Sequence, residues 1–371
     1  MQSSDVVILG GGIAGCLTAY YLAQRGVAAT VVEREAIGSH ASGFAFGGLG
    51  YHSGSGIPGP VFPLAKAGYF LHRDLYDDLL EATGVDTHYR KGSNVKMAFT
   101  PDQAREIEEE VAWQTELGID SQILDLPQVR EIEPRANPEA ISFRLIEESA
   151  AVEAYRLSVA VMQAAGKLGA TLRHGNVVGI KRNGPRPQAA VTESGEEIPC
   201  DTVVIAMGPW SGESASWLDF PVPVSPLKGQ IIRLEMSGDP LACWFSYGDS
   251  YCGTKPDGLT WCGTTEEHAG FDQTTSPQAL QSVMSDAITM VPSLADARLA
   301  LQTACLRPMA SDMLPIVGPV PRWEGVHMCT GGGRKGILLA PAMAKVVSDL
   351  ITDSHSDIDH SGILPSRFTK A

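Results

Sequence analysis

The 371-residue sequence lacks the cysteine spacing of a zinc site or of a disulfide framework. Its 7 cysteines are dispersed, and no two of them are separated as Cys-x-x-Cys. We therefore expect reduced thiols, no metal site and a cytoplasmic protein. The sequence also lacks a run of 18 apolar residues, so it predicts no transmembrane helix. The apolar N-terminal stretch lacks the basic segment that begins a secretory signal peptide.

Positive charge is scarce as well. The sequence has 28 Lys and Arg against 43 Asp and Glu, which gives a formal net charge of −15. Nucleic-acid binding requires Lys and Arg to neutralise phosphates, so we expect no nucleic-acid partner. A hydrophobic content of 44% and a charged content of 19% are ordinary for a globular protein. The length is sufficient for roughly two domains with a large core.

Glycine is abundant, and near the N-terminus it falls into a pattern. Residues 6–9 are an apolar run of strand length, residues 13–25 predict a helix, and residues 28–32 predict a second buried strand that ends at Glu33. Between the first strand and the helix, three glycines have the spacing Gly-x-Gly-x-x-Gly: Gly10, Gly12 and Gly15.

This order of elements is typical of a βαβ unit that binds a dinucleotide. The three glycines allow a tight turn, a close approach of the pyrophosphate and close packing of helix on strand. The helix N-terminus favours phosphate, and the acidic residue after the second strand is placed to accept a hydrogen bond from a ribose hydroxyl. The predicted contacts of this unit are Gly10, Gly12, Ile13, Ala14, Gly15, Glu33 and Arg34.

A second glycine cluster, residues 331–336, repeats the same spacing between a predicted strand at 326–330 and a predicted helix at 336–351. A second dinucleotide unit would need another strand and an acidic residue near position 355, and the sequence shows no such strand. We interpret the cluster as a helix N-terminus directed at the first nucleotide site. There its dipole would favour the negative charge of a reduced flavin. A structural glycine loop is the alternative.

Other local patterns near the C-terminal end predict a helix over residues 277–290 and a turn at residues 318–321. The polar residues from Thr352 onward predict a loose tail.

Five segments, in this order, resemble the FAD-dependent amine and amino-acid oxidases of the D-amino-acid oxidase type. Glycine oxidase and sarcosine oxidase are the most similar members, and the resemblance covers nearly the whole chain. The segments are the N-terminal fingerprint at 5–33, the loop at 42–50, and residues 206–211, 306–308 and 331–341.

The resemblance implies an α/β fold with two domains. A Rossmann-like FAD-binding domain would comprise residues 1–88, 150–222 and 305–371. A discontinuous substrate-binding domain, built on a large antiparallel sheet, would comprise residues 89–149 and 223–304. The other implied FAD contacts are Ser42, Gly43, Gly47, Val178, Gly208, Trp210, Gly333, Arg334, Lys335, Gly336, Ile337 and Leu338.

The resemblance also implies a substrate site. Arg307 matches the arginine that binds the substrate carboxylate, and Tyr251 matches the active-site tyrosine. Gly48 replaces a larger apolar residue of glycine oxidase and Lys335 replaces a neutral amide, which suggests a larger or more anionic substrate. The candidates for binding a second carboxylate are His52, Lys255, Arg334 and Lys335.

The implied reaction is the oxidation of a small amino acid or N-substituted glycine. Hydride passes from the α-carbon to flavin N5, the imine is hydrolysed to an oxo acid, and O2 reoxidises the flavin to give H2O2. We expect non-covalent FAD, because the loop around His40 does not align convincingly with relatives that link their flavin through His or Cys.

Three alternatives are weighed against this reaction. The first is a dehydrogenase that passes electrons to a quinone or a protein. The second is a tRNA-modifying flavin domain, which the negative charge disfavours. The third is a non-catalytic FAD-binding subunit, which Arg307 and Tyr251 disfavour. The substrate amine, the electron acceptor and a homo-oligomeric state are left open.

Overall fold

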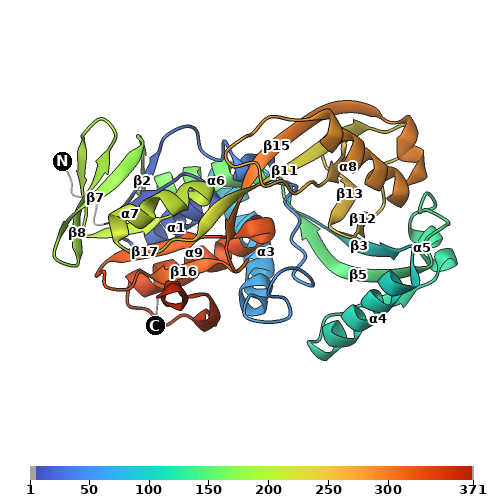
Figure 1. Cartoon of the computed structure of the whole chain (residues 1–371), viewed down its shortest axis with the longest axis horizontal. Coiled ribbons are helices and arrows are strands. Elements are labelled where there is room, and N and C mark those ends of the chain that lie inside the picture. The colour runs from blue at the N-terminus through green and yellow to red at the C-terminus, as the bar shows by residue number, and fades with distance from the viewer. Residues whose placement is uncertain (1–5, 370–371) are drawn as a thin grey trace. The chain divides into compact units, whose positions relative to one another are not determined.

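The computed structural model describes residues 6–369 and divides the chain into two compact units (Figure 1). The first unit comprises Met1–Tyr89, Val152–Leu227 and Leu306–Ala371, and the second comprises Arg90–Ala151 and Lys228–Cys305. Within the described residues, none of the helices combines the length and apolar character that a membrane span requires.

The first unit is built on a six-stranded sheet whose central strands are almost wholly apolar. Its order is β16 (Ile316–Pro319), β17 (Val326–Thr330), β10 (Thr202–Ile205), β1 (Val6–Leu9), β2 (Ala29–Glu33) and β6 (Thr171–His174). All neighbouring pairs are parallel except β16 with β17. Every residue of β1 is buried, as expected for a parallel strand covered on both faces.

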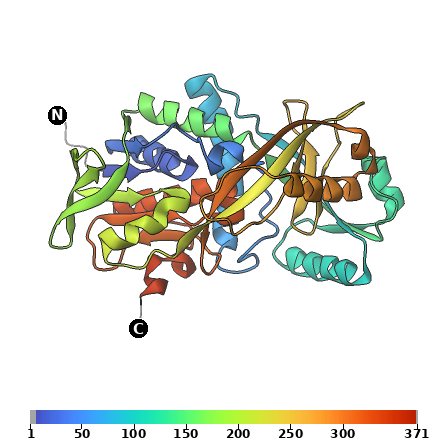
Figure 2. The same cartoon turned by 45° about the horizontal axis from the view of Figure 1, so that its top comes forward.

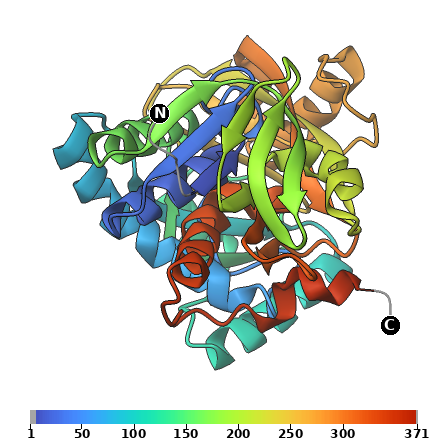
Figure 3. The ribbon, with the colours of Figure 1, turned by 90° about the vertical axis from the view of Figure 1, so that its left-hand side faces the viewer.

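Helices and a small antiparallel sheet complete this unit. The small sheet contains β7 (Val177–Asn183), β8 (Arg186–Thr192) and β9 (Glu197–Pro199), and β7 and β8 lie near the viewer in Figure 3. The helices are α1 (Ile13–Gln24), α2 (Ala41–Phe44), α3 (Phe62–Thr83), α6 (Ala154–Lys167), α7 (Ala215–Leu218) and α9 (Gly336–Ile351). Helix α1 packs against α6 and α9, and α3 also packs against α9.

The second unit is built on an eight-stranded sheet. Its order is β15 (Arg298–Ala310), β11 (Val224–Glu235), β14 (Thr260–Gly263), β13 (Ser250–Thr254), β12 (Trp244–Tyr247), β3 (Arg90–Ala98), β5 (Ser142–Ala151) and β4 (Gln122–Leu124). The two long strands β11 and β15 lie side by side (Figure 2). The first residues of β11 and the last residues of β15 belong to the first unit. The helices are α4 (Pro101–Glu116), α5 (Leu126–Ile132) and α8 (Pro277–Met290).

One face of this sheet is closed by α8. The helix packs on β12, β13 and β14, and the buried side chains there include Phe245, Cys252, Cys262, Val283 and Ala287. The architecture confirms the predicted α/β fold with a Rossmann-like first domain and a second domain on a large sheet. In that sheet β14 pairs antiparallel with β11 and β13, β13 with β12, and β5 with β3 and β4. The pair β3–β12 is parallel, which the long stretch of chain between the two strands permits.

Two local predictions are wrong. The turn expected at 318–321 begins too early, because Gly318 and Pro319 pair with β17 as part of β16. The tail after Thr352 was expected to be loose, but it forms two short 3₁₀ turns, Ser361–Ile363 and Pro365–Phe368. Ile363 is fully buried, and the Arg367 Nε donates to Asp312 Oδ2 over 2.7 Å, so tertiary contacts order a polar segment.

Candidate cofactor and substrate sites

Three loops of the first unit meet at one edge of its sheet. Strands β1, β10 and β17 are parallel neighbours, so their carboxyl ends share that edge. The loops that follow them cover residues 10–12, 206–211 and 331–335 and contain seven of the predicted FAD contacts. In open α/β sheets, ligands bind outside the carboxyl ends of the strands.

The first loop accepts only glycine at two positions. Gly10 has a φ of +105°, and a Cβ atom there would lie 2.5 Å from the Ala206 carbonyl oxygen. A Cβ atom at Gly15 would lie 2.0 Å from the Gly10 carbonyl oxygen. At Gly12 the nearest atom to an added Cβ is the Ser42 Oγ, at 3.3 Å. The loop and helix α1 therefore pack backbone against backbone, as the predicted roles of Gly10 and Gly15 require.

Two helix N-termini at this edge have electrostatics suited to an anion. In the described residues, neither Gly12 before α1 nor Lys335 before α9 caps its helix with its side chain, and neither first turn contains an acid. The Ser42 Oγ accepts from the Ile13 N–H at 3.0 Å, which places Ser42 at the start of α1. The N–H groups and dipoles of such termini favour phosphate and negative charge.

Glu33 lies beside the first loop. Its Oε2 accepts from the Gly11 N–H at 2.6 Å, and its Oε1 accepts from the Glu35 N–H at 2.8 Å. Each carboxylate oxygen can accept a further hydrogen bond, so these contacts leave capacity for a ribose hydroxyl. The structure therefore places Glu33 at the end of β2 with its carboxylate turned toward the glycine loop.

An aromatic stack joins two other predicted FAD contacts. The Arg34 Cζ lies 4.0 Å from the centroid of the Trp210 ring, and the His40 ring lies 4.7 Å from that ring. The His40 Nε2 is 3.0 Å from the Glu35 Oε1, and this hydrogen bond lowers the pKa of the Glu35 carboxyl. The polar end of β2 and the turn after β10 are thereby held together.

The loop after α2 contains two of the predicted substrate residues and is bonded to a third. The Lys335 Nζ donates to the Gly50 carbonyl at 2.8 Å. His52 is buried, and a Cβ atom at Gly50 would lie 2.5 Å from its Nε2. Gly48 is exposed. Lys335 thus fastens the loop backbone.

Arg307 lies in β15, close to the turn before α9. Met309 bridges to Gly332, and a Cβ atom at Gly333 would lie 2.9 Å from the Met309 Sδ. Side chains two residues apart on a strand point to the same face. The half-buried Arg307 therefore lies on the side of β15 that faces the turn at Gly332 and Gly333.

In the second unit, Tyr251 lies on one face of the eight-stranded sheet with basic and aromatic side chains. It pairs with Gly263, where a Cβ atom would lie 2.5 Å from the Tyr251 Oη. The guanidinium of Arg233 is 3.6 Å from the Trp261 ring centroid, and the buried Lys255 Nζ is 5.6 Å from it. Arg233 was not predicted as part of this group, because only the register of β11 with β14 brings it onto Trp261.

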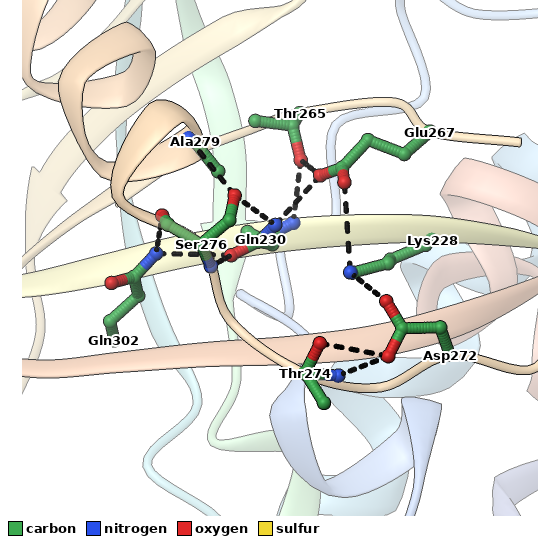
Figure 4. A network of polar contacts seen from close by, with 9 residues as sticks. All are labelled: Lys228, Gln230, Thr265, Glu267, Asp272, Thr274, Ser276, Ala279 and Gln302. Carbon is green, nitrogen blue, oxygen red and sulfur yellow. Dashed lines mark hydrogen bonds and ion pairs between the residues drawn. The ribbon is translucent and has the colours of Figure 1, made fainter. Parts of the chain in front are cut away.

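A polar network that was also not predicted from the sequence fastens segment 264–276 to β11 (Figure 4). The Lys228 side chain is 3% exposed, and its Nζ lies 2.6 Å from Asp272 Oδ2 and 3.6 Å from Glu267 Oε2. Its hydrogen bond holds the pKa of Asp272 at about 2. Gln230 is fully buried; its Nε2 donates to Glu267 Oε1 at 2.8 Å, and its Oε1 accepts from the Ser276 N–H at 2.9 Å.

The predicted residues are divided between the units. Gly48, His52, Arg307 and Lys335 belong to the first unit, and Tyr251 belongs to the second. Val178, the predicted adenine neighbour, lies on β7 with an exposed side chain. The part of the chain that the structure describes contains no group of three or more His, Cys, Asp or Glu able to hold a metal ion.

This chain is similar along nearly its whole length to FAD-dependent oxidoreductases. The family model described as FAD dependent oxidoreductase (DAO) matches residues 5–350. The chain is 29% identical over 375 residues to glycine oxidase of Pseudomonas putida, covering 98% of this chain and 99% of the relative. It is 28% identical over 404 residues to hydrogen cyanide synthase subunit HcnC of Pseudomonas aeruginosa, covering 99% and 97%.

The crystal structure of glycine oxidase from Geobacillus kaustophilus has the same fold. Its TM-score to this chain is 0.94 at 27% sequence identity, and 99% of each chain is covered. Both units of this protein are therefore represented in that structure.

Proposed function

Because the chain belongs to the DAO family of FAD-dependent oxidoreductases, we propose that it is an oxidase of a small amino acid or an N-substituted glycine. The observation that carries this proposal is the match to glycine oxidases along the whole of both chains. Glycine, sarcosine, iminodiacetate and D-amino acids are the substrates to be distinguished. O2 would be the electron acceptor and H2O2 a product.

FAD is the family's cofactor, and the glycine loops of the first unit fit it. Gly10 and Gly15 leave no room for a side chain, and the starts of α1 and α9 present N–H groups to a pyrophosphate or to a flavin ring that carries negative charge. We assign FAD to the first unit, which also contains four of the five residues proposed for the substrate. When bound, FAD would accept the hydride from the substrate α-carbon.

Arg307 is the residue proposed to bind the substrate carboxylate. A guanidinium binds a carboxylate through two parallel hydrogen bonds and stays charged at all working pH values. Fixing the carboxylate orients the α-carbon, and orientation supplies much of the rate when the flavin performs the chemistry. Tyr251 is proposed as a further hydrogen-bond donor to the substrate.

Lys335 and His52 are proposed to set the preference for a second acidic group. The Lys335 ammonium is bonded to the Gly50 carbonyl, which ties its positive charge to the loop that contains Gly48 and His52. Gly48 is exposed and has no side chain to occupy space there. A dicarboxylic secondary amine or an acidic D-amino acid would use this charge. Turnover of iminodiacetate or D-aspartate at rates no higher than glycine would contradict this part of the proposal.

The test is a peroxide-coupled oxygen assay on the purified holoenzyme. The panel contains glycine, sarcosine, iminodiacetate, D-alanine, D-proline and D-aspartate. H2O2 formation with one of these amines supports the oxidase. Absence of H2O2 together with anaerobic bleaching of the flavin by one amine would instead support a dehydrogenase.

The second candidate is a dehydrogenase. The chain matches hydrogen cyanide synthase subunit HcnC as completely as it matches the glycine oxidases, so the similarity does not single out an oxidase. In that case a quinone or a protein would accept the electrons. If no amine in the panel bleaches the flavin, the substrate lies outside small amino acids, and the role proposed for Arg307 is wrong.

A further inference from the structure

The first turn of helix α9 contains a carbonyl group that its own helix cannot satisfy. In an α-helix, the carbonyl of residue i accepts from the N–H of residue i+4. Residue 341 is a proline inside α9, and proline has no N–H, so the Ile337 carbonyl lacks that partner. Ile337 is buried, and a buried carbonyl left unpaired is destabilising.

A histidine from helix α3 takes the place of the missing N–H. The His72 Nε2 lies 2.7 Å from the Ile337 carbonyl oxygen. A carbonyl can only accept, so the hydrogen of the neutral ring is on Nε2. The ring is 2% exposed, and its Nδ1 has no hydrogen-bond partner among residues 6–369. Burial lowers the pKa of His72 to about 4, so the ring is neutral at pH 7.

Helix α3 contacts the next carbonyl of α9 as well. A Cβ atom at Gly68 would lie 2.1 Å from the Leu338 carbonyl oxygen, so the two helix backbones touch there. Gly68 and His72 are four residues apart and share one face of α3. Together they hold two consecutive carbonyls of the first turn of α9. This turn follows directly on the glycine loop at residues 331–335, at the carboxyl edge of the sheet.

We propose that His72 is a positioning residue for the flavin: by replacing the N–H that Pro341 removes, it holds the first turn of α9 in register with the cofactor site. The proline frees the Ile337 carbonyl for this bond, and the histidine couples α3 to the turn whose N–H groups and dipole favour negative charge. The inference rests on the proposed place of FAD in the first unit and is independent of which amine is oxidised.

The test compares four variants of the holoenzyme: His72→Leu, His72→Gln, Pro341→Ala and the double variant His72→Leu/Pro341→Ala. The measurements are the dissociation constant of FAD from the apoprotein and the midpoint potential of the bound flavin. His72→Leu should weaken FAD binding about tenfold or more and lower the potential, because the α9 dipole is displaced. Pro341→Ala alone should change both values little.

The double variant provides the decisive comparison. Its restored N–H at position 341 satisfies the Ile337 carbonyl, so FAD affinity and potential should return to within about twofold of the unchanged protein. His72→Gln keeps a hydrogen-bond donor, so its FAD affinity and flavin potential should lie between those of His72→Leu and the unchanged protein. If His72→Leu reduces FAD affinity and flavin potential equally in the presence and absence of Pro341→Ala, the proposal is overturned. If His72→Leu alone does not fold, the double variant and His72→Gln give the same comparison against Pro341→Ala.

A second buried histidine serves as the control. His327 lies at the start of β17 in the same unit, and burial lowers its pKa to about 4 as well. His327→Gln should lower stability without changing FAD affinity or potential. An equal effect of both histidines on the flavin would indicate general destabilisation and contradict positioning by His72. FAD affinity and flavin potential can be measured even if no amine in the substrate panel is oxidised, so failure of the proposed function would not decide this test.

Discussion

At the scale of single residues, the glycine loop depends on atoms that a side chain would displace. A Cβ atom at Gly15 would lie 2.0 Å from the Gly10 carbonyl, which is backbone and cannot move without moving β1. Gly15→Ala should therefore yield protein without FAD, measured as the ratio of flavin to protein absorbance.

The matched control is Gly166→Ala in helix α6, where an added Cβ atom meets nothing described within 4 Å. That change should retain FAD and raise the free energy of unfolding by about 0.5–1 kcal/mol. Normal flavin content in Gly15→Ala would show that the loop does not hold the cofactor.

The proposed carboxylate contact is also tested at a single residue. Arg307→Lys keeps the charge but loses the two parallel hydrogen bonds, so kcat/KM should fall about 100-fold, mainly through KM. In Arg307→Ala, kcat/KM should fall further. Arg322→Lys, at an exposed arginine of the same unit, should leave kcat/KM unchanged. A KM for Arg307→Ala equal to that of the unchanged enzyme would rule out the assignment.

At the scale of elements, segment 264–276 is held by side chains more than by apolar packing. Residues 268–275 are exposed, and the buried Lys228 ammonium neutralises Asp272 and Glu267. Lys228→Met should leave two neighbouring carboxylates without their cation, and the segment should detach. Amide hydrogen exchange in residues 268–275 should then speed up at least about tenfold.

Lys228→Arg is the matched control, because it retains a positive charge and should preserve slow exchange. High salt should have little effect on the unchanged protein, since the ammonium is buried. Equal exchange rates in Lys228→Met and the unchanged protein would show that the network in Figure 4 does not hold the segment.

At the scale of the whole molecule, two buried histidines make stability depend on pH. The pKa values of His72 and His327 are lowered from 6.5 to about 4 in the folded state. Below pH 6.5 the unfolded chain binds a proton at each site while the folded chain does not. The free energy of unfolding should be constant above pH 6.5 and fall as pH drops toward 4, by up to about 3 kcal/mol for each histidine.

Urea unfolding of the holoenzyme at pH 7.5, 6 and 5 measures this dependence. His327→Gln should remove about half of the fall. Asp272, whose pKa is about 2, contributes in a different window, because its stabilisation is lost only as pH falls below about 4. A free energy of unfolding that stays constant from pH 6.5 to 5 would contradict the prediction.

Much of the fold could be predicted from local patterns. Helix α8 at Pro277–Met290, strand β17 at Val326–Thr330 and helix α9 at Gly336–Ile351 have the predicted bounds, because each has its own periodicity and terminal residues. Strands β5 and β15 were not predicted. The first carries the buried Arg144, which is tolerated because its Nη1 donates to Glu110 on α4 at 2.8 Å, and the second is exposed over its first four residues.

Local sequence patterns were sufficient to identify the class of protein: a dinucleotide fingerprint, a second glycine cluster before a helix, and an ordered set of motifs typical of the FAD-dependent family. These features are readable because each depends on neighbours within about 20 residues. Folding in three dimensions brings His72 to the Ile337 carbonyl, Arg233 onto the Trp261 ring and Lys228 to Asp272. Such contacts join residues whose separation in the chain carries no local signal, so strand register and helix packing alone select them.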